Sequence, residues 1–377
     1  MTCEYFNTCG SCNLAITYEK QLDFKLQREK KRFSDFYTND IDIIQSEEQH
    51  FRSRAEFRVF HIDNSISYAM NDVNKKLLCI DSCPIVDKSI YDLMPKLLEA
   101  IKDDEILCKK FFSVEFLSSL DGQVLVTMIY HKKLDEAWEE KAKELEKKLN
   151  IYIIGRSRKQ KVILTKDYIE EKLPINNDTY NMVYHEGSFT QPNTKTNIKM
   201  IQWVIDNINE GGDLCELYCG AGNFTIPLSK KFDKVLATEI SKTSIRAAIA
   251  NCELNNVSNI NFIRMSSEEF VEALNDVREF RRLKDVNLDD YNFKNKTTSE
   301  NKSTTIFVDP PRAGLDETTT KLVKDFNQII YISCNPETLH RDLIQLNDTH
   351  EIKHFALFDQ FVYSKHIECG AVLYKRD

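Results

Sequence analysis

A cysteine and a glutamate near the C-terminal end of the chain have the side-chain types that nucleophilic catalysis needs. Cys334 stands in Ser-Cys-Asn-Pro directly after the apolar run 329–332, so we expect a partly exposed thiol at a strand end. Glu368 has apolar neighbours, and burial there would raise the pKa of its carboxyl group. This pair suits addition of a thiolate followed by removal of a proton. Glu337 and Asp359 are weaker candidates for the base.

A glycine-containing turn indicates a nucleoside-binding site. The segment Glu-Leu-Tyr-Cys-Gly-Ala-Gly-Asn, residues 216–223, places Gly220 and Gly222 where a Cβ atom would hinder both the turn and the approach of a ligand. Glu239, at the next expected strand end, is placed to accept hydrogen bonds from ribose hydroxyls. The third glycine of the dinucleotide fingerprint is missing near Thr225, so S-adenosylmethionine fits better than NAD.

A thiolate beside a methyl donor indicates a definite reaction. Carbon 5 of uracil is a poor nucleophile, but addition of a thiolate to carbon 6 produces an enolate that can attack a sulfonium methyl group. A base must then remove the proton of carbon 5 before the thiolate is eliminated.

Two other classes of function stay open. Asp309-Pro-Pro-Arg would suit an enzyme that methylates exocyclic amino groups without a cysteine, and a non-catalytic RNA chaperone or iron–sulfur sensor would need no methyl transfer.

The elements that must position these residues follow two patterns. Residues 15–36 and 134–149 are expected to be helices, and short alternating strands between residues 51 and 175 indicate an α+β module. From residue 176 to 377, units of strand, turn and helix repeat, which predicts a parallel-dominated sheet with helices on both faces. Ligands bind such α/β sheets at the carboxyl ends of the strands, where the candidate residues are expected.

Composition and charge narrow the class of protein. The chain has 377 residues, a net charge of −8 and eleven cysteines, without an apolar run long enough to span a membrane or a secretory signal. We therefore expect a cytoplasmic protein with free thiols. The acidic average hides basic clusters in the first half that could bind a phosphate backbone. These clusters are residues 20–32, 52–58, 131–133 and 156–161.

Several stretches resemble the RNA 5-methyluridine methyltransferases, and within that family the branch that acts on bacterial tRNA. The resemblance runs from about Phe51 to the C-terminus. It is carried by residues 51–58, 130–135, 154–156, 187–193, 216–223, 277–283, 308–315, 331–338, 357–361 and 366–370. It implies a C-terminal Rossmann-like class I methyltransferase domain at 176–377, a central α+β RNA-binding domain at 51–175, and an N-terminal tail and helix at 1–50. The polar stretch 279–303 is an excursion without an assigned role.

The resemblance also implies roles for individual residues. Cys334 would be the nucleophile and Glu368 the base of methyl transfer from S-adenosylmethionine to carbon 5 of the T-loop uridine of tRNA. Six positions would hold S-adenosylmethionine: Gln191, Tyr218, Gly220, Asn223, Glu239 and Asp309. Arg58, Phe112 and His131 would touch the T-arm, with Phe112 stacked on an unpaired base. We expect a monomer with no obligate protein partner; tmRNA is a further candidate substrate, and the alternative function is the same reaction on 23S rRNA.

The N-terminal cysteines depart from the tRNA-specific branch. Cys3, Cys9 and Cys12, together with Cys83 before a proline, resemble the motif that holds a [4Fe–4S] cluster in the branch that acts on ribosomal RNA. Four thiolates also suit Zn²⁺, and the spacing alone does not choose between the two metals. Cys79 is a competing fourth ligand, and unrelated free thiols are the remaining alternative.

Overall fold

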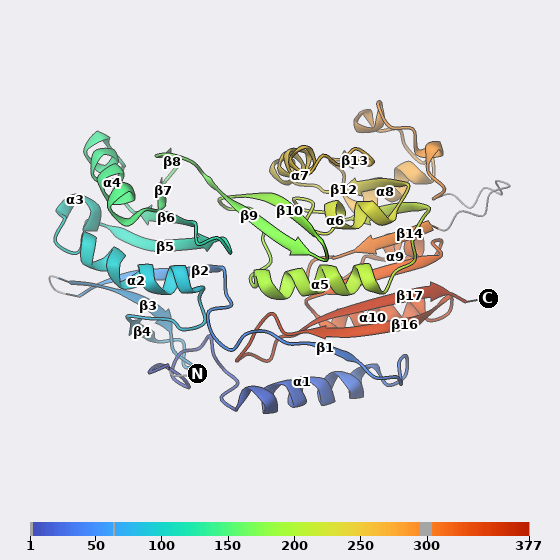
Figure 1. The fold of residues 1–377 in the computed structure, drawn as a ribbon, viewed down its shortest axis with the longest axis horizontal. Helices are drawn as coiled ribbons and strands as arrows, with labels where there is room; N and C mark the ends of the chain where they lie inside the picture. Colours follow the sequence, from blue (N-terminus) through green and yellow to red (C-terminus); the bar gives the residue numbers. More distant parts are fainter. Residues whose placement is uncertain (1–2, 63–64, 294–303, 377) are drawn as a thin grey trace.

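The computed structural model describes residues 3–62, 65–293 and 304–376, which form two large sheets joined by a hairpin (Figure 1). The N-terminal sheet has the strand order β4-β3-β2-β5-β6-β7-β8. Its strands are β2 (Arg54–Ile62), β3 (Ser65–Asn71), β4 (Leu77–Ile80), β5 (Phe111–Ser118), β6 (Val124–Tyr130), β7 (Tyr152–Ser157) and β8 (Gln160–Ile163). The helices of this part are α2 (Lys88–Ile101), α3 (Glu105–Cys108) and α4 (Glu136–Leu149).

One face of the N-terminal sheet is packed and the other is open. Along β2, Ala55, Phe57 and Val59 are buried in a core that includes residues of α2 and α4. Successive side chains of a strand point to opposite faces, so Arg54 and Arg58 lie on the face that these helices leave uncovered. The alternation seen in the sequence thus produces an open face that carries both arginines and glutamates.

The C-terminal sheet is the predicted α/β sheet. Its strand order is β1-β16-β17-β15-β14-β11-β12-β13. The strands are β1 (Asp42–Ile44), β11 (Asp213–Leu217), β12 (Lys234–Thr238), β13 (Ile260–Ile263), β14 (Thr304–Val308), β15 (Gln328–Ser333), β16 (His350–Phe358) and β17 (Glu368–Lys375). The helices are α5 (Thr194–Asp206), α6 (Thr225–Leu228), α7 (Lys242–Leu254), α8 (Ser267–Leu274), α9 (Glu317–Val323) and α10 (Pro336–Leu346). Leu214 and Cys215, consecutive on β11, enter different core clusters, which confirms that both faces are covered.

The last strand departs from the parallel pattern. β17 lies between β15 and β16 and is antiparallel to both, whereas β11 to β15 pair in parallel. The sequence predicted only that parallel strands dominate, because periodicity along the chain does not reveal the direction of a strand in the sheet.

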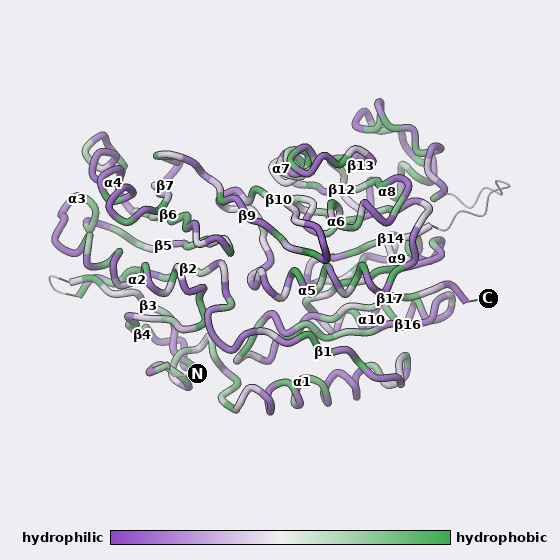
Figure 2. The backbone as a smooth tube through the Cα atoms, viewed as in Figure 1, coloured by the Kyte–Doolittle hydropathy of each residue, from purple (hydrophilic) through white to green (hydrophobic). Residues whose placement is uncertain are grey.

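The N-terminal segment packs on the C-terminal sheet. β1 pairs in parallel with β16, and α1 (Tyr18–Phe33) buries Phe33 against Phe355 with ring centroids 4.8 Å apart. The helix is shorter at both ends than the one predicted over 15–36. Figure 2 shows hydrophobic and hydrophilic residues alternating along α1, as expected of a helix with one packed face.

Two further segments complete the description. The antiparallel hairpin of β9 (Tyr168–Ile175) and β10 (Asp178–His185) crosses the boundary expected between residues 175 and 176. The excursion expected at 279–303 is described up to residue 293, where Tyr291 and Phe293 are buried in the core of the C-terminal sheet; the remainder lies outside the described residues. Among the described residues, no helix is long and apolar enough to cross a membrane.

Candidate active site

Cys334 and Glu368 meet at one edge of the C-terminal sheet. Ser333 on β15 pairs with Cys369 on β17, so Cys334 follows one strand where Glu368 begins its antiparallel neighbour. Both residues line a cavity of about 410 Å³. Its other lining residues are Arg52, Arg54, Ala55, Glu56, Glu115, Phe189, Thr190, Pro192, Arg312 and Phe361. The cavity therefore lies between the two sheets, with the open face of the N-terminal sheet at its margin.

Burial favours the protonated form of the Glu368 carboxyl group. Glu368 is 5% exposed, and burial, together with the negative charge of Asp309, raises the pKa of its carboxyl group to about 8. The Gln360 amide donates a hydrogen bond to Glu368 Oε2 at 3.0 Å, which opposes this rise. A carboxylate with a pKa near the working pH can take up a proton during turnover and release it afterwards.

The thiol of Cys334 has a mixed electrostatic environment. Burial raises the pKa of the Cys334 thiol, and the charges of Glu368 and Asp309 raise it further, whereas Arg312 lowers it. The Arg312 carbonyl accepts a hydrogen bond from the Asn335 side-chain amide at 3.0 Å, which ties its loop to the turn after Cys334. We gave Arg312 no role from the sequence, although it ends the Asp-Pro-Pro-Arg motif.

The other two candidates for the base are already engaged elsewhere. Glu337 is exposed and lies 3.7 Å from Arg32 of α1. Asp359 is fully buried and forms an ion pair with Lys25 at 2.6 Å. Glu337 and Cys334 both line a separate cavity of about 280 Å³, whereas Glu368 shares with Cys334 the cavity that faces the N-terminal sheet.

The predicted nucleoside loop leads from the carboxyl end of β11 into α6 and lies beside the carboxyl end of β12. Gly220 and Gly222 have φ of 55° and 85°, and a Cβ atom at Gly222 would lie 3.0 Å from Ile226 Cδ1. Glu239 follows β12, and its carboxylate accepts hydrogen bonds from the Gly220 N–H at 3.2 Å and the Ser241 N–H at 2.7 Å. The acidic side chain and the turn expected to form the site are thus in direct contact.

The remaining predicted cofactor residues surround this loop or connect it to the cavity. Tyr218 has φ of 65° and donates a hydrogen bond to Ser267 Oγ at 2.8 Å. The amide groups of Asn223 and Asn197 exchange hydrogen bonds of 2.8 and 2.9 Å. Gln191 Oε1 accepts a hydrogen bond from Gln360 at 2.9 Å, which places it beside Glu368.

Two carboxyl groups with raised pKa values lie on or directly after the neighbouring strands β11 and β14. Asp309 follows β14, and burial raises its pKa to about 7. Glu216 on β11 is 1% exposed, and burial together with the charge of Asp309 raises its pKa to about 8. Its Oε2 has no hydrogen-bond partner among the described residues. We did not single out Glu216 from the sequence, although an acidic residue just before a glycine turn was the available signal.

The three residues predicted to contact RNA lie close together on the N-terminal sheet. Phe112 is the additional residue where the pairing of β5 with β6 shifts register, and its side chain is 42% exposed. Its ring stacks on His131 with centroids 4.0 Å apart and planes at 21°. Arg58 pairs across the sheet with Ser113, the residue after Phe112.

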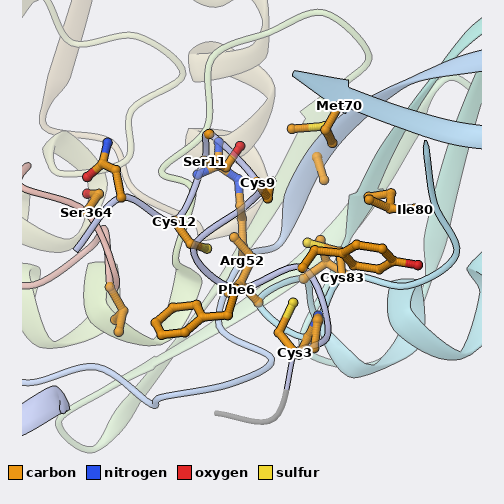
Figure 3. A pocket seen from close by; sticks show the side chains of 18 of the residues that line it. Cys3, Phe6, Cys9, Ser11, Cys12, Arg52, Met70, Ile80, Cys83 and Ser364 are labelled. Atoms are coloured by element: carbon orange, nitrogen blue, oxygen red, sulfur yellow. The ribbon is translucent and has the colours of Figure 1, made fainter. Parts of the chain in front are cut away.

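The four predicted metal ligands line a second cavity, of about 380 Å³. Cys3, Cys9, Cys12 and Cys83 all contribute to its wall, as Figure 3 shows. Burial, with a smaller contribution from the neighbouring cysteines, raises the pKa of the Cys12 thiol to about 12. Across the part of the chain that the structure describes, no three His, Cys, Asp or Glu side chains are arranged to hold a metal ion. The structure brings these cysteines to one place without forming a ligand set.

Known proteins match the chain over nearly its whole length. The model of the tRNA (uracil-5-)-methyltransferase family matches residues 17–376. The tRNA/tmRNA (uracil-C(5))-methyltransferase of Aliarcobacter butzleri is 58% identical over 382 residues, covering 100% of this chain and 99% of the relative. The corresponding protein of Sulfurovum sp. is 50% identical and covers 100% of both chains.

A solved structure shares the fold at lower identity. The tRNA (uracil-54, C5)-methyltransferase of Pyrococcus abyssi, solved with S-adenosyl-L-homocysteine, has a TM-score of 0.71 and 22% identity, and the match covers 96% of this chain and 85% of that one. The strand arrangement and the match to the family model agree with the resemblance found in the sequence. The chain belongs to the tRNA (uracil-5-)-methyltransferase family.

Proposed function

We propose that this protein transfers a methyl group from S-adenosylmethionine to carbon 5 of the T-loop uridine of tRNA. The observation that carries the proposal is the shared cavity of Cys334 and Glu368, which is bordered by the open face of the N-terminal sheet with Arg54. Membership of the family and the names of the relatives support uracil as the target base. The tRNA-like part of tmRNA is a second substrate of the same shape.

The strand-end loop fits S-adenosylmethionine. A positive-φ turn at Gly220 and Gly222 leaves the backbone accessible, and the carboxylate of Glu239 is an acceptor suited to a ribose diol. Tyr218, Asn223, Asp309 and Gln191 would complete the site. When bound, this cofactor supplies an electrophilic methyl group on a sulfonium sulfur.

In the proposed reaction, the Cys334 thiolate adds to carbon 6 of the uracil, and the electron pair moves toward carbon 5 and the carbonyl oxygen. Carbon 5 would then take the methyl group, while the bond from that methyl group to the sulfonium sulfur breaks and leaves a neutral thioether. Glu368 removes the proton that remains on carbon 5, the carbon 5–carbon 6 double bond forms again, and the bond from carbon 6 to sulfur breaks. The pKa of about 8 lets Glu368 accept this proton and pass it to solvent after the RNA leaves.

Phe112, His131 and Arg58 would hold the T-arm next to the cavity. An exposed aromatic pair offers a stacking platform for an unpaired base, and arginines bind phosphates. The target uridine must leave its stack to reach Cys334, so contacts to neighbouring nucleotides are needed to hold the opened loop.

The proposed tRNA substrate implies that the reaction takes place in the cytoplasm. The protein is expected to act as a monomer, because one chain supplies both Cys334 and Glu368.

Incubation with 5-fluorouridine-substituted tRNA and S-adenosylmethionine tests this function. Fluorine cannot leave carbon 5 as a proton, so the wild-type protein should form a covalent RNA adduct that survives denaturing electrophoresis. Cys334→Ala should form none while still binding RNA. Adduct formation on ribosomal RNA but not on tRNA would assign the protein to the alternative substrate. Methyl transfer by Cys334→Ala would contradict the mechanism and support the amino-methylating class.

We also propose that Cys3, Cys9, Cys12 and Cys83 hold a [4Fe–4S] cluster. Convergence of four soft ligands on one cavity supports this, although their side chains must reorient to form a ligand set. Anaerobically purified protein should contain iron and acid-labile sulfide, and Cys83→Ser should lose both, whereas Cys252→Ser should keep them. Zinc without iron would reassign the metal, and metal-free protein would refute the proposal.

A further inference from the structure

A buried lysine of the N-terminal helix holds a segment next to the catalytic cavity. Lys25 on α1 is 1% exposed, and its ammonium group donates hydrogen bonds to Asp359 Oδ1 at 2.6 Å and to the Phe361 carbonyl at 3.1 Å. These two residues flank Gln360 in the sequence. One ammonium group therefore contacts the side chain that precedes Gln360 and the backbone that follows it.

Gln360 in turn holds Glu368. Gln360 is fully buried, and its side-chain amide nitrogen lies 3.0 Å from Glu368 Oε2 and 2.9 Å from Gln191 Oε1. The amide thus orients the carboxylate of the proposed base and links it to a predicted cofactor residue. A shift of the Gln360 backbone would move this amide away from Glu368.

Other residues of α1 attach to the same segment. Gln21 Oε1 accepts a hydrogen bond from the Tyr363 N–H at 2.8 Å. The Arg28 guanidinium donates one to the Lys365 carbonyl at 2.8 Å. The helix therefore binds residues 359–365 at several points, and Lys25 is the point beside Gln360.

Stability alone is a weak explanation for the ion pair between Lys25 and Asp359. Taking both charges out of water costs free energy, and well-packed apolar side chains often stabilise a fold as well as a buried ion pair does. The burial cost is evident because burial lowers the pKa of Lys25, against the opposing effect of Asp359. The hydrogen bond from Lys25 to the Phe361 carbonyl also fixes the position of the backbone, which a contact between apolar side chains would not do.

We propose that Lys25 is a positioning residue for the base Glu368, acting through Asp359 and Gln360. The proposal rests on the proposed function, in which Glu368 takes the carbon 5 proton after methyl transfer. The sulfur of Cys334 is still bonded to carbon 6 at that stage. If Glu368 is misplaced, the proton stays on carbon 5, the double bond does not form again, and the methylated RNA remains bound to sulfur.

The variant Lys25→Met tests this inference on the full-length protein with natural tRNA. Lys143→Met is the matched control, because Lys143 pairs with Glu139 at an exposed position on α4. We expect Lys25→Met to lower kcat for tritium release from carbon 5 by about 10- to 100-fold. KM for tRNA should fall by a similar factor, because slowing a step after adduct formation lowers kcat and KM together. A denaturation-resistant RNA adduct should accumulate on natural uridine, whereas the control should behave as wild type.

Asp359→Asn is the second variant, for use if Lys25→Met does not fold as judged by circular dichroism. It keeps the side-chain shape and an acceptor for the ammonium group, and a smaller loss of kcat with the same adduct is expected. A folded variant with wild-type kcat would overturn the inference. So would a slowed folded variant that accumulates no adduct. Failure of the proposed function is distinguishable, because the wild-type protein would then form no adduct with 5-fluorouridine-substituted tRNA.

Discussion

Glu368 lies across from Cys334 because β17 runs against the direction of β15, one position beyond the pair of Ser333 and Cys369. A parallel strand at that place would start at the opposite edge of the sheet. The antiparallel strand instead brings its first residue to the carboxyl edge, where β11, β12 and β14 also end. The nucleophile, the base and the nucleoside loop therefore share one edge of the C-terminal sheet.

Glu368→Gln should separate methyl transfer from product release. The amide keeps the size of the side chain but cannot accept the carbon 5 proton, so we expect turnover to fall by about 10²- to 10⁴-fold. A single methyl group per enzyme should still be transferred, and the RNA should stay covalently bound. Quenched-flow counting of labelled methyl groups, beside tritium release, measures the two steps. Equal loss of both steps would contradict the assignment of Glu368 to the later step.

The rate of methylation should increase with pH up to the alkaline range. Glu368 must be deprotonated to act as the base, and burial raises its pKa to about 8. The pKa of the Cys334 thiol is also raised, so the thiolate fraction increases in the same direction. Measurement of kcat under saturating RNA from about pH 6 to about pH 9 checks this, because that range spans the raised pKa of Glu368. A rate that falls over this range would contradict it.

Phe112→Ala should weaken RNA binding without impairing the chemical step. Loss of one stacking contact is expected to cost about 1–3 kcal/mol of binding free energy. Ile249→Ala is the control, since Ile249 is 43% exposed on α7 and Phe112 is 42% exposed. Fluorescence titration with a T-arm hairpin gives Kd, and kcat at saturating RNA should stay near the wild-type value. Unchanged Kd would remove Phe112 from the RNA-binding surface.

Glu216→Gln should stabilise the protein at alkaline pH. The folded-state pKa of Glu216 is raised to about 8 from an ordinary value of 4.5, so its contribution to stability is fully present below about 4.5 and is lost as the pH rises through about 8. The neutral amide avoids this loss, and we expect a gain of about 2 kcal/mol in unfolding free energy near pH 9. Urea unfolding at about pH 5 should show no such gain. A gain of the same size at both values would exclude ionisation as the cause.

The sequence predicted the C-terminal fold and the location of the site because short apolar strands ending in Gly, Asp or Cys have a recognisable pattern. Gly220, Glu239 and Asp309 could be placed at strand ends from that pattern alone. The direction of β17 and the contact of Lys25 with Asp359 could not be predicted in this way. Both depend on which segments meet in space, and Lys25 is separated from its partner by 334 positions. In the sequence it was one of several lysines in a basic helix.

The docking of α1 and β1 onto the last strands has a consequence for the order of folding. β1 pairs with β16, and α1 binds the segment between β16 and β17. Segments from both ends of the sequence therefore form one side of the C-terminal sheet. During synthesis helix α1 emerges long before its partners exist, and its apolar face must remain uncovered until β16 and the segment after it have been made. Pairings this distant in sequence are slow to form. The proposed catalytic edge is therefore expected to assemble only after β17 has emerged from the ribosome.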